Sequence, residues 1–211
     1  MTAGWGRAEG YSLAELLVAT AVLMTVTGAA GVLATSVQRT AMAADAEHAA
    51  RMDARHTLAS VTRALEAAGS YAYGRPASVC GAGGDAAPLV LDPRGDGRRD
   101  AVRVRADINP PNGVLGGRGG RCDEAGEDVL IALDREAGTV TRRDGASSAG
   151  PVAISEGRVT GLRFEYRTAD GSAASRAEDV VAVTVTLTVR VDGSPDTRPR
   201  VYTATTRLRE D

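Results

Sequence analysis

The sequence is poor in aromatic residues, which make up 3% of its 211 residues and include one Trp and one Phe. Aromatic rings supply the stacking surfaces of many ligand and single-stranded nucleic-acid sites, so a site of that kind is not expected. Lysine is absent, because all 25 basic residues are arginine. We attribute this bias, together with the abundant Ala and Gly, to a GC-rich coding sequence rather than to function.

An excess of charge of one sign is also missing. Charged residues form 25% and hydrophobic residues 43% of the chain, and the formal net charge is −2 at pH 7. This balance excludes a polybasic nucleic-acid-binding protein and a disordered acidic segment. The length fits one ordinary folded domain, or one domain with an appendage.

Recognisable catalytic motifs are missing as well. His48 and His56 are the only histidines, and their separation does not match the i, i+4 pair of a helical zinc site. The sequence contains no G-x-S-x-G nucleophile motif and no P-loop. The glycine-rich runs at residues 81–84 and 116–120 follow no strand-to-helix pattern, so we interpret them as loops. We therefore expect that the protein is not an enzyme.

A long uncharged run is present near the N-terminus. No residue between Glu15 and Arg39 is charged. As a helix, the 23 residues from Leu16 to Gln38 span roughly 35 Å, which matches a bilayer core of about 30 Å. The pattern predicts a membrane-spanning helix. A secretory signal peptide is the competing interpretation, but its apolar region has only about 7–15 residues and ends at a small-x-small cleavage site.

The residues in front of this run carry a resemblance to a known family. Gly10 is followed by Tyr11-Ser-Leu-Ala-Glu15 and then directly by the apolar run. This order resembles the class III signal of type IV pilins and pseudopilins. The resemblance implies that residues 1–10 are a leader, that prepilin peptidase cuts after Gly10, and that Tyr11 becomes the N-methylated N-terminus. It also makes Glu15 the glutamate through which subunits of this family assemble.

Glu15 is unusual on physical grounds too. A lone carboxylate at the edge of a membrane helix costs on the order of 3 kcal/mol unless it is paired. Cleavage after Gly10 would create a cation at similar depth, the Tyr11 ammonium of a neighbouring subunit. The alternative is a carboxylate that snorkels to the lipid headgroups without a partner.

The helix is expected to continue beyond the membrane. No proline occurs from Tyr11 to Arg75, and apolar residues recur at roughly helical spacing. These residues are Val37, Ala41, Ala44, Met52, Leu58, Val61 and Leu65. We predict a transmembrane half over residues 11–38 and an exported amphipathic half over residues 39–68, with Gly69 placed to end the helix.

After residue 88 the spacing of apolar residues changes from a helical repeat to every second residue. Alternating runs separated by Gly- and Asp-rich turns predict about seven strands. The segments lie at residues 89–91, 102–105, 128–133, 138–142, 162–167, 181–191 and 202–208. The sequence thus predicts an α+β pilin-like fold, in which a long N-terminal helix packs against an antiparallel β-sheet domain over residues 69–211.

The last third of the chain carries a second resemblance. Pro151–Ile154, Val159–Tyr166 and Ala169–Gly171 precede a long Val-rich strand and a closing strand. The pattern is similar to W-type minor pilins and to J-type pseudopilins of type II secretion. It implies a minor structural subunit that assembles into, or primes, a type IV pilus or a type II secretion pseudopilus.

The two resemblances imply a location and a set of partners. The expected location is the bacterial inner membrane, crossed once, with an exported periplasmic domain, and then the filament near its tip. The expected partners are prepilin peptidase, other pilin or pseudopilin subunits, the inner-membrane assembly platform and the lipid bilayer.

The alternative function is a membrane-tethered or tip-located binding module that captures DNA or an exported substrate. Scattered arginines are candidate phosphate contacts: Arg98, Arg99, Arg103, Arg105, Arg118 and Arg121. They are interleaved with carboxylates such as Asp96, Asp100 and Asp107. Direct DNA binding is therefore the weaker interpretation.

Two cysteines, Cys80 and Cys122, lie in the predicted exported domain. A disulfide between them would close a loop and contribute roughly 4 kcal/mol of stability. Two free thiols are the alternative, since sequence alone does not fix cysteine pairing.

Three carboxylates, Asp92, Asp96 and Asp100, are spaced four residues apart around glycines and resemble a calcium-binding loop. The stretch lacks the terminal bidentate glutamate of such loops and contains three arginines. An ordinary Asp/Gly turn is the favoured interpretation, with calcium as the alternative, and no other cofactor is expected.

Overall fold

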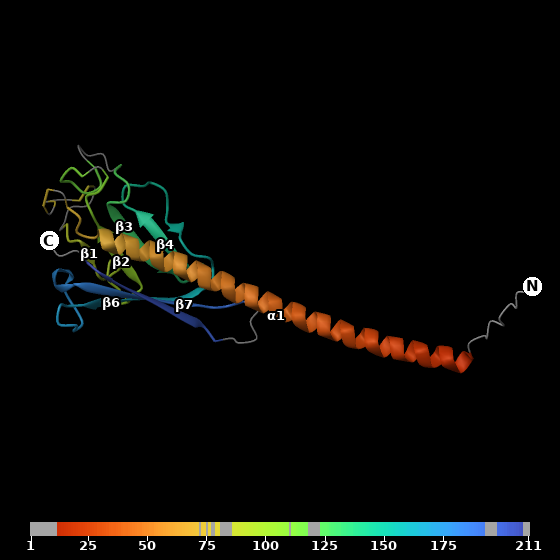
Figure 1. Ribbon diagram of the computed structural model, residues 1–211. Coiled ribbons are helices and arrows are strands. Elements are labelled where there is room, and N and C mark those ends of the chain that lie inside the picture. Colours follow the sequence, from red (N-terminus) through yellow and green to blue (C-terminus); the bar gives the residue numbers. More distant parts are fainter. Residues whose placement is uncertain are drawn as a thin grey trace, which may run out of the picture. The chain divides into compact units, whose positions relative to one another are not determined.

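The computed structural model describes residues 12–71, 73–74, 76, 79–80, 86–109, 111–117, 123–192 and 198–208. The chain divides into two compact units between Asp45 and Ala46. The first unit contains the N-terminal part of a long helix, α1 (Leu13–Ala67), and the second contains the rest of α1 and the strands. The predicted α+β class is confirmed, with one long N-terminal helix and a C-terminal antiparallel β domain (Figure 1).

The first unit presents an apolar helical surface. Leu16, Leu17 and Leu23 are all more than 60% exposed. The helix is long and apolar enough to cross a membrane. In a lipid bilayer these exposed side chains contact hydrocarbon instead of water, so α1 has the composition of a membrane anchor.

In the second unit, α1 packs on the β domain with a stripe of small and aliphatic side chains. Its buried residues are Ala50, Ala54, Thr57, Leu58, Val61 and Leu65. Of the apolar residues that recur at helical spacing, Leu58, Val61 and Leu65 belong to this stripe, whereas Met52 is 51% exposed. Val37, Ala41 and Ala44 are exposed as well. Alanines occur on every face of this helix, so its apolar spacing alone does not reveal which stripe meets the sheets.

Gly69 ends the helix, as predicted. Its φ of +76° lies in the left-handed region that glycine adopts without strain. The Gly69 N–H turns away from α1 and donates to the Arg105 carbonyl at 3.0 Å. The end of α1 is thereby tied to the sheet that follows.

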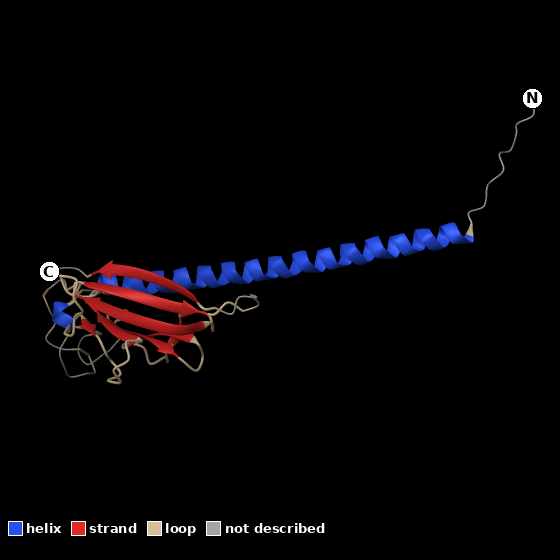
Figure 2. Ribbon diagram, turned by 90° about the horizontal axis from the view of Figure 1, so that it is seen from below, coloured by secondary structure: helices blue, strands red, loops and turns tan. Residues whose placement is uncertain are grey.

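The strands form two antiparallel sheets within the described part of the chain, where one sheet domain was predicted. The first sheet has the order β1-β2-β3-β4-β5 and the second has the order β6-β7-β8, so sequential strands are neighbours. Figure 2 shows the strands in red beside the C-terminal part of α1. The strands are β1 (Leu89–Val90), β2 (Ala101–Arg105), β3 (Asp128–Asp134), β4 (Thr139–Asp144), β5 (Val152–Ala153), β6 (Val159–Arg167), β7 (Ala182–Val189) and β8 (Arg200–Arg207). A short 3₁₀ helix, η1 (Ala177–Asp179), precedes β7.

The short strand β5 was not predicted. Its two residues are both exposed, so they show none of the alternation on which strand prediction rests. The two sheets adjoin along β6, where the Phe164 N–H donates to the Arg99 carbonyl and the Val159 N–H to the Gly138 carbonyl, both at 2.8 Å.

One apolar core joins α1 and both sheets. In β7, Val183, Val185, Leu187 and Val189 are buried, which confirms the predicted alternation. Tyr166 is buried beside them, its hydroxyl donates to the Leu91 carbonyl at 3.2 Å, and burial raises its pKa. A smaller cluster of Val79, Ala86 and Leu115, with Tyr71 packed against it, lies outside this core.

Candidate functional site

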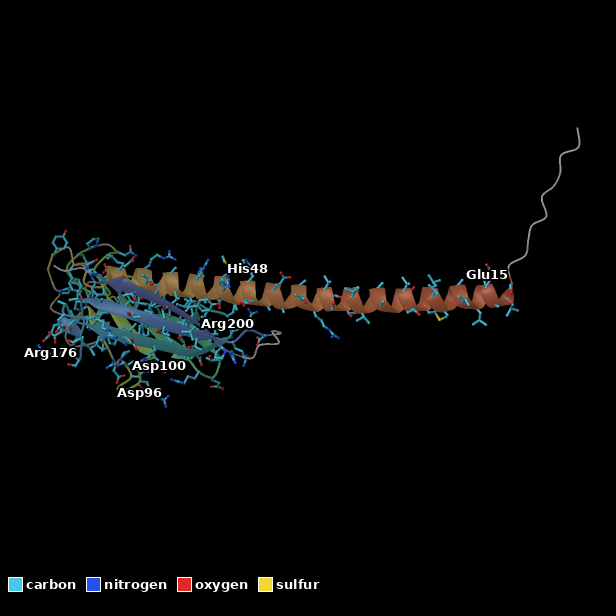
Figure 3. All side chains as sticks on the ribbon, turned by 60° about the horizontal axis from the view of Figure 1, so that its bottom comes forward. Glu15, His48, Asp96, Asp100, Arg176 and Arg200 are labelled. Atoms are coloured by element: carbon cyan, nitrogen blue, oxygen red, sulfur yellow. The ribbon has the colours of Figure 1, made fainter. Side chains whose placement is uncertain are left out.

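The candidate site is the beginning of α1. The Ser12 carbonyl accepts hydrogen bonds from the N–H groups of Glu15 at 2.9 Å and Leu16 at 3.1 Å, which starts the helical turn. Glu15 lies in the first turn and is exposed (Figure 3). A carboxylate at this end interacts favourably with the helix dipole, by about 0.3–1 kcal/mol at an exposed site.

The polar hydroxyls further along the apolar segment are satisfied within the helix. Each donates to a backbone carbonyl three or four residues earlier, at 2.7–3.0 Å. The donors are Thr20, Thr25, Thr27, Thr35, Ser36 and Thr40. This pattern suits a bilayer, where water is not available to take these bonds.

Glu15 differs from these hydroxyls because no described residue compensates its charge. It makes no ion pair with the described residues, and the next charged residue along α1 is Arg39. A membrane-embedded Glu15 therefore has to find its cation outside the described part of this chain or reach the headgroups.

The predicted processing residues, Gly10 and Tyr11, lie outside the described residues. The structure thus brings Glu15 to the start of the helix, and cleavage after Gly10 and methylation of Tyr11 stay predictions.

Comparisons of the chain with protein-family models, curated proteins and solved structures give no match.

The calcium candidates are not gathered into one site. Asp92 accepts hydrogen bonds from the N–H groups of Gly95 at 2.9 Å and Gly97 at 2.8 Å. Asp96 likewise accepts from the Arg98 N–H at 2.9 Å. These are the contacts of an Asp/Gly turn, which was the favoured interpretation.

Asp100, the third calcium candidate, faces arginines instead. Its carboxylate accepts from Arg135 Nη2 at 2.7 Å and from Nε of the same residue at 3.1 Å. Within the described residues, no three His, Cys, Asp or Glu side chains are placed to hold a metal ion.

The predicted arginines divide into two groups. Arg103 and Arg105 both pair with Asp128, at 3.2 and 3.1 Å, and Arg105 is 8% exposed. These two are therefore committed to the fold. Arg98 and Arg99 are exposed, and Arg118 and Arg121 lie outside the described residues.

Cys80 is disulfide-bonded, whereas Cys122, its predicted partner, lies outside the described residues. The Cys80 N–H donates to the Leu115 carbonyl at 2.8 Å, which places the cysteine against the smaller apolar cluster. The predicted pairing would staple a part of the domain that contributes little to the main core.

Two buried acids were missed by the sequence reasoning. Glu127 is 0% exposed and Asp107 is 2% exposed. Asp107 accepts from the N–H groups of Asn112 at 2.8 Å and Gly113 at 2.7 Å. The Asn-Gly pair is a turn signal that was available in the sequence, but nothing in the sequence marks Glu127.

A latch between α1 and the segment after β5 was also missed. The Asp53 carboxylate accepts from the Glu156 N–H at 3.2 Å, and the Thr57 hydroxyl donates to the Ile154 carbonyl at 3.2 Å. Partial burial raises the pKa of Asp53. His48 and His56 are exposed on the same helix.

Proposed function

We propose that this protein is a minor pilin or pseudopilin, a structural subunit of a type IV pilus or a type II secretion pseudopilus. The observation that carries the proposal is Glu15, a carboxylate that has no ion pair among the described residues and lies at the start of an apolar helix whose hydroxyls are internally bonded. The Gly10-Tyr11 sequence in front of it supports the same proposal. The layout of one long helix followed by an antiparallel β domain agrees with it.

In this mechanism the apolar helix holds the subunit in the inner membrane, with the β domain exported. Prepilin peptidase removes residues 1–10, and the Tyr11 amine is methylated. During assembly, Glu15 of the incoming subunit pairs with the Tyr11 amine, or the equivalent amine, of a neighbour. Pairing removes the cost of an unpaired carboxylate in the membrane, about 3 kcal/mol, and so favours the assembled state.

The processing step is tested by intact-mass and N-terminal peptide analysis of membranes from cells with and without active prepilin peptidase. The chain has no lysine, so no lysine side chain competes with the N-terminal amine in amine labelling, and methylation converts that amine from primary to secondary. We expect a peptide that begins at N-methylated Tyr11 only when the peptidase is active. An intact Met1 in both kinds of cell would contradict the proposal.

The assembly step is tested with Glu15→Gln, which keeps the shape of the side chain and removes its charge. We expect normal cleavage and a filament-to-membrane ratio at least tenfold lower than that of the unmodified protein. The matched control is Glu66→Gln, because Glu66 is an exposed carboxylate near the other end of α1. Equal filament ratios for the two variants would contradict the role of Glu15.

A further inference from the structure

Two adjoining hollows on the β domain have six arginines among their lining residues. The first has a volume of about 320 Å³ and is lined by Arg98, Arg99, Arg135 and Arg163 around Asp100. The second, of about 370 Å³, shares Arg135 and adds Arg158 and Arg190. Asp100 and Glu136 are the acids among the lining residues, so arginine predominates in a chain whose net charge is −2.

The loop that carries Arg98 and Arg99 is held in place before any ligand binds. Asp92 and Asp96 bond the backbone N–H groups of the turn, as described above. The Arg94 guanidinium donates to the Leu133 carbonyl at 3.2 Å, and the Arg99 carbonyl accepts from the Phe164 N–H. A fixed backbone lowers the entropy cost of binding.

The arginines differ in how firmly they are held by carboxylates. Arg135 is bound to the buried Asp100. Arg163 and Arg190 pair with Glu165 and Asp192, at 3.2 and 2.9 Å, on the surface, whereas the half-buried Arg158 pairs with Glu156 at 3.2 Å. The exposed pairs of Arg163 and Arg190 are worth only about 0–1 kcal/mol, so a ligand anion displaces them at little cost.

Two arginines are left to meet an anion. Arg98 and Arg99 are exposed and form no ion pair with the described residues. Guanidinium groups bind phosphate oxygens through paired N–H donors, so the hollows offer unfilled donors of the kind that a phosphate accepts from.

The surroundings decide which phosphate ligand fits. Leu133, Val159 and Leu162 line the hollows but are buried, so they present no apolar side chain for insertion into a membrane. Phe164 and Tyr166 are buried too, and aromatic side chains are absent from the lining, so unstacked bases find no platform. Contacts to phosphates alone, spread over two hollows, fit a duplex backbone.

We propose that these hollows bind the phosphate backbone of double-stranded DNA without reading its sequence. The hollow around Asp100 lies on the side of the β domain that is turned away from α1 (Figure 3). DNA binding here does not depend on cleavage or on filament assembly, and so it is tested separately from the proposed function.

The test uses the full chain in neutral-detergent micelles and a fluorescent 30-base-pair duplex, with binding measured by anisotropy. If four arginines contact phosphates, affinity falls roughly 100-fold between 50 and 200 mM salt. We expect Arg98→Ser/Arg99→Ser to weaken binding at least tenfold at 50 mM salt and to reduce the slope of log affinity against log salt by about 2.

The matched control is Arg142→Ser/Arg143→Ser, which removes a consecutive pair of exposed arginines from β4. This control is expected to bind within twofold of the unmodified chain. Equal losses in the two double variants, or no binding at 50 mM salt, would overturn the proposal. Tighter binding to phosphatidylglycerol vesicles or to polyglutamate than to the duplex would overturn the assignment to DNA.

Discussion

Glu127 is a fully buried carboxylate that organises the loop between β2 and β3. Its Oε1 accepts from the N–H groups of Ile108 at 3.0 Å and Asn109 at 2.8 Å, and its Oε2 accepts from the Gly116 N–H at 2.9 Å. Three backbone donors replace the water that the buried carboxylate has lost. The loop conformation therefore depends on both oxygens being acceptors.

We expect Glu127→Gln to destabilise the β domain by about 2 kcal/mol, because the new NH₂ group faces a backbone donor and leaves it unsatisfied. Urea unfolding followed by circular dichroism measures this loss in neutral detergent. The control is Glu136→Gln, which changes an exposed carboxylate and is expected to leave the midpoint unchanged. Identical midpoints for both variants would show that the Glu127 bonds do not support the fold.

At the residue scale, sequence prediction succeeds where the local sequence makes a residue stand out. Glu15 was found because it begins a stretch that is otherwise free of charge. Arg105, a candidate phosphate contact in the sequence, is 8% exposed and paired with Asp128. That pairing comes from the β2–β3 register, which sets Arg105 opposite Asp128. The register between two strands cannot be predicted from the alternation within one strand.

Among the elements, α1 has two parts with different roles. Leu65 is 0% exposed in the core, so we expect Leu65→Ala to cost about 3 kcal/mol through lost burial and the cavity left behind. Urea unfolding of the β domain measures the effect. Leu23→Ala is the matched change in the apolar part of the same helix, where Leu23 is 65% exposed.

Leu23→Ala is expected to leave the urea midpoint of the β domain unchanged, because the Leu23 side chain is not part of the core of that domain. A similar loss in both variants would mean that the two units unfold together. No loss for Leu65→Ala would contradict its place in the core.

The sequence predicts the existence of most elements better than their packing. The length of α1, its end at Gly69 and the alternation in β7 follow from local periodicity, and all three are confirmed. The division into two sheets does not follow from local periodicity. It depends on hydrogen bonds between distant segments, such as the one between Phe164 and Arg99. The latch from Asp53 to the Glu156 backbone joins residues about a hundred positions apart and is invisible for the same reason.

At the scale of the whole molecule, the disulfide gives the clearest test of the side of the membrane on which the β domain lies. A bond between Cys80 and Cys122 would contribute roughly 4 kcal/mol and would form on the oxidising side of the membrane. We expect a 2 Da mass increase on reduction and a lower urea midpoint in reductant. Cys122→Ser in the same titration is the control, since its midpoint should equal the reduced value with or without reductant. An unchanged mass after reduction would contradict the pairing.

The way α1 joins the β domain has a mechanical consequence. From Ala46 onward the helix is held by five apolar residues in the core, by the Asp53 and Thr57 bonds, and by the ion pair of Glu47 with Arg200 at 3.6 Å. The strands of the second sheet run along this part of α1 (Figures 1 and 2). A pull along the helix axis therefore loads these contacts in shear, so that they must break together rather than one after another, and the β domain travels with the helix.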